Sequence, residues 1–422
     1  MALSAVLGGC RGFSHADVTV TILDPEWSHD AQERHVSSDN MLLEFTRETG
    51  IQVKHLPAPE TSPGQLELSR HLLEKASVTP DVYGIDVVWP GILSEYLIDL
   101  KPYFASELAS EDPEVLANYT VEGKLVAVPY HANTGVLYYR TDLLLKYGYQ
   151  EPPGTWAELE EMALRIQQGE RARGEKEFWG FVWPGAESEG LTCNALEWQV
   201  GEGGGPIIEA DQTISVDNPD AIRSWERARH WVGWISPSSV TSYQEWDASN
   251  AFWISGRAAF FRGWTSDYFL SHPPDKPFLG ESGVTSVPGG KAARTGILGG
   301  FGLGVSRFST HRAEAVRLVE FLKKQEAGLE MARSRSEAPK RPEPYELPVI
   351  LKAYARPGKS GEKGASAVAR PSTVTGLKYD SVAQAYAGAV HAVLTGKSKA
   401  PEAAADLEKE LVRITGFKTG RR

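Results

Sequence analysis

Residues 122–144 read EGKLVAVPYHANTGVLYYRTDLL, and residues 152–159 read PPGTWAEL. The first stretch holds two short β-rich runs, at 125–128 and 136–140. Polar and aromatic residues at 130–135 separate these runs, and loops held between strands commonly carry binding groups. We therefore expect a strand, a loop and a second strand.

The second stretch predicts a helix. Thr155 is a good N-cap, and Glu158 follows it at the spacing of a capping box. Apolar residues then recur at helical spacing, at Trp156, Leu159, Met162, Ala163 and Ile166. The charged residues 167–178 predict a solvated connection after this helix. From the pattern alone, the whole unit could equally be scaffold without a function of its own.

The N-terminal region alternates between strand and helix patterns. Strands are predicted at 17–23, 51–53 and 79–86, and helices at 40–48 and 90–97. This order is typical of a parallel sheet covered by helices. In such sheets ligands bind at the carboxyl ends of the strands, which here are residues 24–27 and 86–89.

The C-terminal half continues the same mixture. Residues 252–264 predict a helix end that leads through Gly256 into a strand, and residues 298–305 predict a glycine-rich strand. Further helices are predicted at 218–234, 313–322, 379–394 and 403–414.

Taken together, blocks 123–162, 252–264 and 296–322 resemble the sugar-binding group of the extracytoplasmic solute-binding proteins of ABC importers, with a looser resemblance over nearly all the chain after residue 16. The pattern is most similar to maltose- and trehalose-binding receptors. The resemblance implies an α/β periplasmic-binding-protein fold, with two discontinuous lobes joined by a three-crossover hinge around a ligand cleft. Lobe 1 would take residues 16–128 and about 293–335, and lobe 2 residues 129–292 and about 336–422.

The resemblance also implies a binding site. Glu26, Asp86 and Asn133 would accept hydrogen bonds from sugar hydroxyls, because carboxylates are acceptors only and charge-assisted bonds are strong. Some relatives carry Asp where this chain has Asn133, which removes a charge. Trp264 would stack on the apolar face of a sugar ring.

Backbone groups of Gly299 or Gly300 and the guanidinium of Arg370 would complete this site. Weaker candidates are Trp27, Trp89, Tyr130, His131, Trp183 and Tyr379. Ordinary roles remain open for these residues: a solvated loop acid for Glu26, a helix cap for Asp86, core packing for Trp264, a surface ion pair for Arg370, and loop packing for Tyr130 and His131.

Net charge and cysteine content exclude some classes of function. The 422 residues carry a formal net charge of −11, which argues against nucleic acid as a partner. The chain has two cysteines, Cys10 and Cys193, so a disulfide framework is excluded. Cys193 fits a small buried hydrophobe. Leu7-Gly8-Gly9-Cys10 looks like a lipobox without the usual basic residues before it, so residues 1–15 are expected to be a signal and tether with Cys10 lipidated, or else a disordered terminus.

The sequence therefore predicts a monomeric receptor, without catalytic residues, cofactor or metal, that delivers a disaccharide to the membrane subunits of an ABC permease at the extracytoplasmic, periplasmic face of the membrane. Two alternatives stay open. One is a receptor of the same fold for a polyol, a phosphorylated glycerol or an oligosaccharide. The other is a glycoside hydrolase that would draw a carboxylate pair from Glu26, Asp86, Glu187 and Glu189.

Overall fold

The computed structural model describes residues 18–23, 34–59, 62–108, 111, 113–265, 267, 282–335 and 366–420. The predictions for residues 1–15 with Cys10, and for Glu26 and Trp27, lie outside these ranges.

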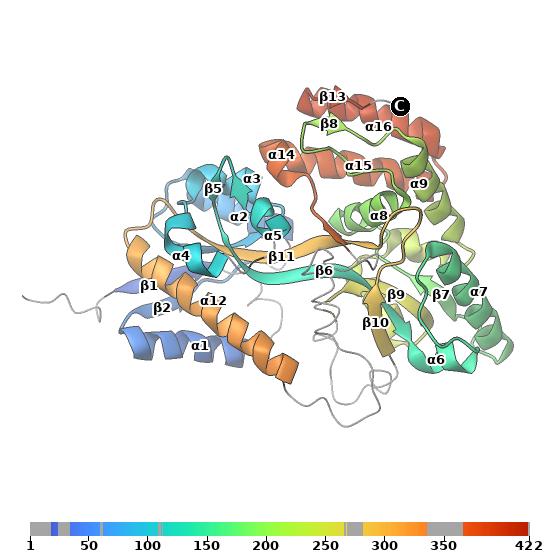
Figure 1. Cartoon of the computed structure of the whole chain (residues 1–422), viewed down its shortest axis with the longest axis horizontal. Helices are drawn as coiled ribbons and strands as arrows, with labels where there is room; N and C mark the ends of the chain where they lie inside the picture. The colour runs from blue at the N-terminus through green and yellow to red at the C-terminus, as the bar shows by residue number, and fades with distance from the viewer. Residues whose placement is uncertain are drawn as a thin grey trace, which may run out of the picture.

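The chain forms two α/β lobes, each with its own hydrophobic core, on a shared mixed sheet (Figure 1). Among the described residues, nine strands make up this sheet, whose main path is β2-β1-β3-β11-β6-β9-β7, with β10 paired to β6 and β12 to β11. Strand β6 (Val128–Arg140) and strand β11 (Thr295–Val305) run through both lobes and pair antiparallel. The mixed sheet with two lobes confirms the predicted fold.

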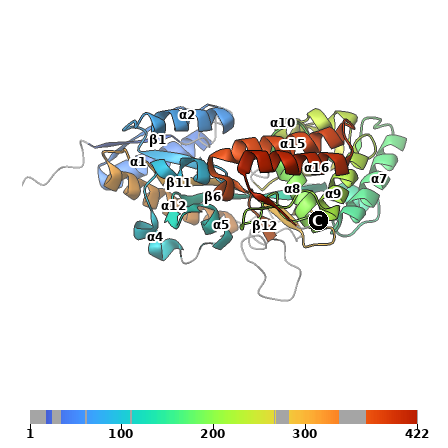
Figure 2. The same cartoon turned by 90° about the horizontal axis from the view of Figure 1, so that it is seen from above.

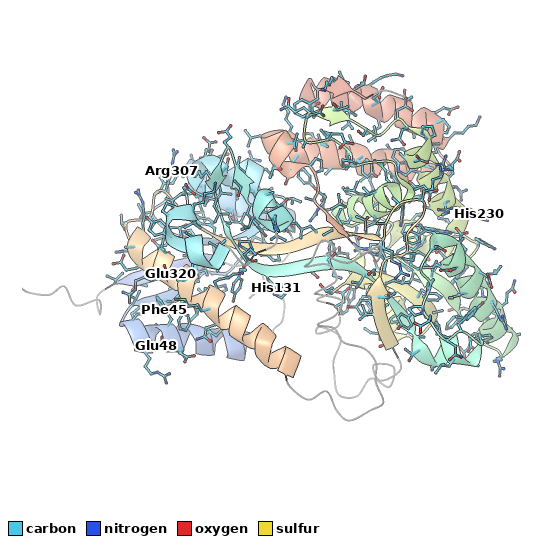
Figure 3. All side chains as sticks on the ribbon, in the orientation of Figure 1. Phe45, Glu48, His131, His230, Arg307 and Glu320 are labelled. Atoms are coloured by element: carbon cyan, nitrogen blue, oxygen red, sulfur yellow. The ribbon has the colours of Figure 1, made fainter. Side chains whose placement is uncertain are left out.

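Lobe 1 follows the expected alternation of strands and helices. Its elements are β1 (Thr19–Leu23), α1 (Arg34–Thr49), β2 (Gln52–His55), α2 (Ser62–Glu74), β3 (Val82–Asp86), α3 (Pro90–Leu93), α4 (Lys101–Leu108), α5 (Pro113–Asn118), β4 (Thr120–Val121), β5 (Lys124–Leu125) and α12 (Arg312–Arg335). Strand β1 pairs parallel with β2 and β3. Helices α1 and α12 pack together through Phe45 and Phe321, whose ring centroids lie 5.4 Å apart (Figure 3 labels Phe45).

Lobe 2 is built mainly from helices around the far end of the sheet. Its elements are α6 (Thr141–Lys146), α7 (Trp156–Ala172), β7 (Trp179–Val182), α8 (Glu189–Glu202), β8 (Thr213–Ile214), α9 (Pro219–Trp231), α10 (Glu245–Ser249), β9 (Ala258–Trp264), β10 (Ser282–Ser286), β12 (Ser366–Val368), α15 (Tyr379–Leu394), α16 (Ala400–Thr415) and β13 (Lys418–Thr419). Helices α15 and α16 lie side by side (Figure 2). Between β12 and α15, the short helix α14 (Ser372–Thr375) packs against α3 of lobe 1.

The expected loop at 130–135 is wrong, because these residues belong to the continuous strand β6. Thr134 pairs with Leu298 and His131 with Phe301, so the backbone of this segment is paired in the sheet. These residues lie within β6, the strand that passes from one lobe to the other, and Figure 3 labels His131 there.

The expected solvated connection at 167–178 is also wrong at its start, because α7 continues to Ala172. Gln167 is buried and donates to the Trp234 carbonyl at 2.8 Å, and Glu170 binds Lys146 Nζ at 2.5 Å. These partners satisfy polar residues that a sequence pattern reads as exposed. The capping box of Thr155 and Glu158 at the start of α7 is confirmed.

The two cores meet within β11. Ile297 is fully buried in the core of lobe 2, and the next residue, Leu298, is buried in the core of lobe 1. The site residues on β11 follow directly, at Gly299 and Gly300.

Candidate functional site

Four predicted site residues lie on neighbouring strands where the lobes meet. Asp86 ends β3 opposite Phe301 of β11, while Gly299 of β11 lies opposite Asn133 of β6. Trp264 ends β9 opposite Gly135 of β6. The sheet register therefore gathers Asp86, Gly299, Asn133 and Trp264 from segments far apart in the sequence.

Trp264 is held from several directions. Its Nε1 donates to Glu245 Oε1 at 2.9 Å, and its backbone N–H donates to Asp267 Oδ2 at 2.7 Å. The guanidinium carbon of Arg262 lies 4.3 Å from the centroid of the indole, in cation–π geometry. Unlike the fully buried Trp156, Trp264 is only half-buried. A rigid, partly accessible indole is the kind of surface on which a flat apolar face can stack.

Gly299 supports the edge of this indole. A Cβ atom at Gly299 would lie 2.7 Å from Trp264 Cζ3, so no larger residue fits there without movement. Gly300 has a φ of 109°, a conformation that favours glycine. Its carbonyl accepts the Val87 N–H at 3.1 Å. This bond ties β11 to the end of β3.

Arg370 lies almost completely buried beside the end of β12. Its Nη1 donates to Glu189 Oε1 at 2.7 Å and its Nη2 to the Leu298 carbonyl at 3.2 Å. The Tyr379 hydroxyl donates to the same Glu189 oxygen. Arg370 thus connects β11 to the first turn of α8 through an ion pair in which its own side chain is 6% exposed and that of Glu189 is 41% exposed.

Asp86, at the end of β3, has a pKa well above its ordinary value. Burial raises its pKa to about 6, an effect opposed by the charge of Arg370 and by the Val88 N–H, which donates to Asp86 Oδ1 at 3.1 Å. The carboxylates of Glu189 and Glu245 raise this pKa further. Acids from both lobes and one arginine therefore share an electrostatic environment.

The side chain of Asn133, expected to accept from sugar hydroxyls, accepts hydrogen bonds within the fold. Its Oδ1 already accepts the Thr265 hydroxyl at 2.5 Å and the Thr134 N–H at 3.1 Å. A carbonyl oxygen has two lone pairs, so both are occupied within the fold.

The weaker candidates separate into two groups. Trp89, Tyr130 and Trp183 are buried in the hydrophobic cores, and the Trp183 Nε1 donates to Ser236 Oγ at 3.1 Å. Tyr379 joins the cluster through Glu189, and half-buried His131 lies on β6 two residues before Asn133. Cys193 is buried in α8 as expected, and burial raises the pKa of its thiol to about 12.

Sequence reasoning missed Glu245 and considered Glu189 only as a hydrolase carboxylate. The one local signal is that both acids occupy the first turn of a helix, where negative charge is favoured. Glu187, the other acid considered, faces His391, with Oε2 3.6 Å from Nδ1.

No helix in the described part of the chain has the length and apolar character needed to span a membrane. The described site combines acceptors, a buried guanidinium and one indole, the groups that can bind a small polyhydroxylated solute.

Comparison with known proteins points to the same class. Residues 34–328 match the family described as bacterial extracellular solute-binding protein. A probable ABC transporter-binding protein of Deinococcus radiodurans is 41% identical over 376 residues, which cover 88% of this chain and 89% of that protein.

Solved structures agree in fold. Maltose-bound MalE3 of T. maritima is 30% identical, with a TM-score of 0.77 over 94% of this chain and 100% of that one. The GacH receptor of Streptomyces glaucescens, solved unliganded and with acarbose, is 22% identical, with a TM-score of 0.75 over 95% of this chain and 99% of that one. The chain therefore belongs to the bacterial extracellular solute-binding proteins.

Proposed function

We propose that this chain is the sugar receptor of an ABC importer, and that it takes a disaccharide of the maltose or trehalose type between its lobes. The observation that carries the proposal is Trp264, a half-buried indole fixed by Glu245 and Gly299 at the junction of β6, β9 and β11. Asp86 at the end of β3 and Arg370, two residues after the end of β12, flank the same junction. The similarity to a maltose-bound protein at 30% identity supports a sugar as the ligand.

Each group has a distinct role in this proposal. The apolar face of one ring stacks on Trp264, while Asp86 accepts from hydroxyls and Arg370 donates to ring or hydroxyl oxygens. Glu189 and Glu245 hold Arg370 and Trp264 in place through their hydrogen bonds. A hydroxyl of the wrong epimer would leave a buried polar group unpaired, at a cost of about 1–3 kcal/mol.

Delivery to the permease follows from closure of the lobes. Strands β6 and β11 are shared by both lobes. Rotation of one lobe relative to the other about these strands would therefore move Asp86 relative to the site residues of lobe 2. A sugar that contacts both lobes binds the closed form more tightly and so shifts the population toward it. The permease subunits would recognise this closed form at the extracytoplasmic face, with the receptor held there as a monomer through lipidated Cys10.

The test is isothermal titration of the full chain with maltose, trehalose, sucrose, glucose, ribitol and glycerol 3-phosphate, with chromatography of the sugars afterwards. We expect one disaccharide to bind at a single site with micromolar or tighter affinity and to be recovered intact. Exclusive binding of ribitol or glycerol 3-phosphate would contradict the disaccharide assignment. Cleavage of the disaccharide would favour the hydrolase.

A second candidate ligand is a longer oligosaccharide. Trp246 in α10 is 70% exposed and directly follows Glu245, the acceptor of the Trp264 indole N–H. An exposed indole beside the site would offer a second stacking surface for another ring. Titration with maltotriose and maltotetraose tests this candidate, because it requires them to bind more tightly than maltose and to lose that advantage in Trp246→Ala.

A further inference from the structure

A buried ion pair lies directly behind the proposed stacking residue. Arg262 of β9 donates to Glu197 of α8 twice, from Nε to Oε2 at 2.9 Å and from Nη2 to Oε1 at 2.7 Å. The two side chains are 1% and 0% exposed. A buried pair of this kind contributes little net stability over apolar residues of the same volume, so its presence calls for another explanation.

The pair connects four elements. Besides Arg262, Glu197 Oε1 accepts the Ile297 N–H of β11 at 3.0 Å. On β6, a Cβ atom at Gly135 would overlap Glu197 Oε1 and lie 2.5 Å from Arg262 Nη2. The ion pair therefore packs against both strands that run between the lobes.

The pair also determines the position of the indole. Arg262 and Trp264 are two residues apart on β9 and so lie on the same face of the strand. The guanidinium carbon lies 4.3 Å from the indole centroid, so Arg262 covers one face of the ring. Glu197 fixes the plane of the guanidinium through two parallel hydrogen bonds, a geometry that lysine cannot reproduce.

We infer that Glu197 and Arg262 are positioning residues: they set the plane of the Trp264 indole relative to β6 and β11, so that its other face is presented to the sugar. This inference rests on the proposed function. Its consequence is that the orientation of the stacking surface depends on the same strands that connect the lobes.

The first test needs no sugar. The near-ultraviolet circular dichroism spectrum of the chain minus that of Trp264→Phe isolates the signal of this indole, which depends on a fixed orientation. We expect this difference signal to be reduced at least about twofold when both members of the comparison carry Arg262→Lys. An unchanged difference signal would overturn the inference, whatever the ligand proves to be.

The second test is sugar affinity by titration, using the disaccharide that binds the unaltered chain. We expect Arg262→Lys to weaken binding about tenfold, and to weaken it less than about threefold when Trp264 is already Phe, because the two residues act through one contact. Equal losses in both backgrounds would indicate a merely structural role.

Two further variants serve as a control and as a substitute for Arg262→Lys. Arg140→Lys is the matched control, because Arg140 makes a similar fork to Asp142, at 2.7 and 2.6 Å, at the far end of β6. Arg140→Lys should leave both the difference signal and the affinity unchanged. An effect as large as that of Arg262→Lys would overturn the inference.

If Arg262→Lys does not fold, the double variant Glu197→Met with Arg262→Met removes both charges and fills the space. That variant should fold and bind at least about tenfold more weakly, and wild-type affinity in it would also overturn the inference.

The outcomes distinguish the two proposals. Absence of sugar binding by the unaltered chain contradicts the proposed function alone. A normal indole signal and normal affinity in the Arg262 variants contradict the positioning role alone.

Discussion

Gly91 of α3 lies directly against the carbonyl oxygen of Ser372 in α14. A Cβ atom at Gly91 would collide with that oxygen and lie 3.1 Å from the Cα atom of Gly376. The Ser372 hydroxyl also donates to the Val87 carbonyl at 3.4 Å. The segment that carries Arg370 is therefore held on lobe 1 by close backbone contact at Gly91 and by the hydrogen bond of the Ser372 hydroxyl.

We predict that Gly91→Ala displaces α14 and with it Arg370. The expected result is a loss of about 1–3 kcal/mol in the free energy of unfolding, because both obstructing atoms belong to the backbone. Sugar affinity should fall as well. Urea unfolding and titration measure the two effects. Gly201→Ala in α8 is the control, since its Cβ would have no neighbour nearer than 3.7 Å, and a loss of stability in that variant equal to the loss in Gly91→Ala would argue against the contact.

Replacement of Trp264 by Leu should remove the proposed stacking surface. We expect sugar affinity to fall about tenfold or more, with a small change in thermal stability because the residue is only half-buried. Titration and thermal unfolding distinguish the two effects. Trp156→Leu offers the opposite pattern, because Trp156 is buried in the lobe 2 core and should affect stability without contacting the ligand. Unaltered affinity in Trp264→Leu would contradict the proposed site.

The raised pKa of Asp86 predicts a dependence of binding on pH. Because the folded-state pKa is about 6, above the ordinary 3.8, Asp86 becomes protonated and loses its full acceptor capacity as the pH falls through about 6. Sugar affinity should fall over the same range. The free energy of unfolding should change in the opposite direction. Because folding raises the pKa of Asp86, protonation of this group stabilises the fold, and that contribution is lost as the pH rises from about 4 to about 6.

Titration between pH 5 and about 8 in Asp86→Asn checks this assignment. The variant should bind more weakly and show a flatter pH profile. Asp267 must be tested beside it, because burial raises the pKa of Asp267 to about 7. If the profile flattens only in Asp267→Asn, then Asp86 is not the group responsible.

Thr155→Ala should weaken α7 without touching the site. It removes the hydroxyl that accepts the Glu158 N–H at 3.2 Å, and the loss of such a cap costs about 1 kcal/mol. Thermal unfolding should record this loss, while titration should give the same sugar affinity as the unaltered chain. A marked drop in affinity would mean that α7 contributes to binding in a way that its position does not explain.

Local patterns were sufficient for much of this fold. The capping box at Thr155, the strand ending at Asp86 and the helix beginning at Tyr379 each depend on residues close together in sequence. The resemblance of the motifs then placed Trp264 and Asp86 in one site, and the register of β3, β11, β6 and β9 does bring these strand ends together.

Other features depend on contacts that a local pattern does not contain. Residues 130–135 form a strand only because β11, encoded far along the chain, pairs with them. Glu245 reaches the site from a helix of five residues, a length too short to leave a periodic signal. The sequence does not distinguish Trp183 from Trp264. In the structure, Trp183 is buried in a core and donates a hydrogen bond to Ser236, whereas Trp264 is half-buried at the end of a strand.

The transition between cores at Ile297 and Leu298 limits how the molecule can move. Ile297 and Leu298 are adjacent in sequence, and each is buried in a different core. No linker residue therefore separates the two lobes along β11. The lobes can therefore rotate relative to one another but cannot draw apart along this strand. In the closure proposed above, a small change in the torsion angles near Gly299 and Gly300 would therefore be expressed as a larger displacement at the outer surfaces of the lobes.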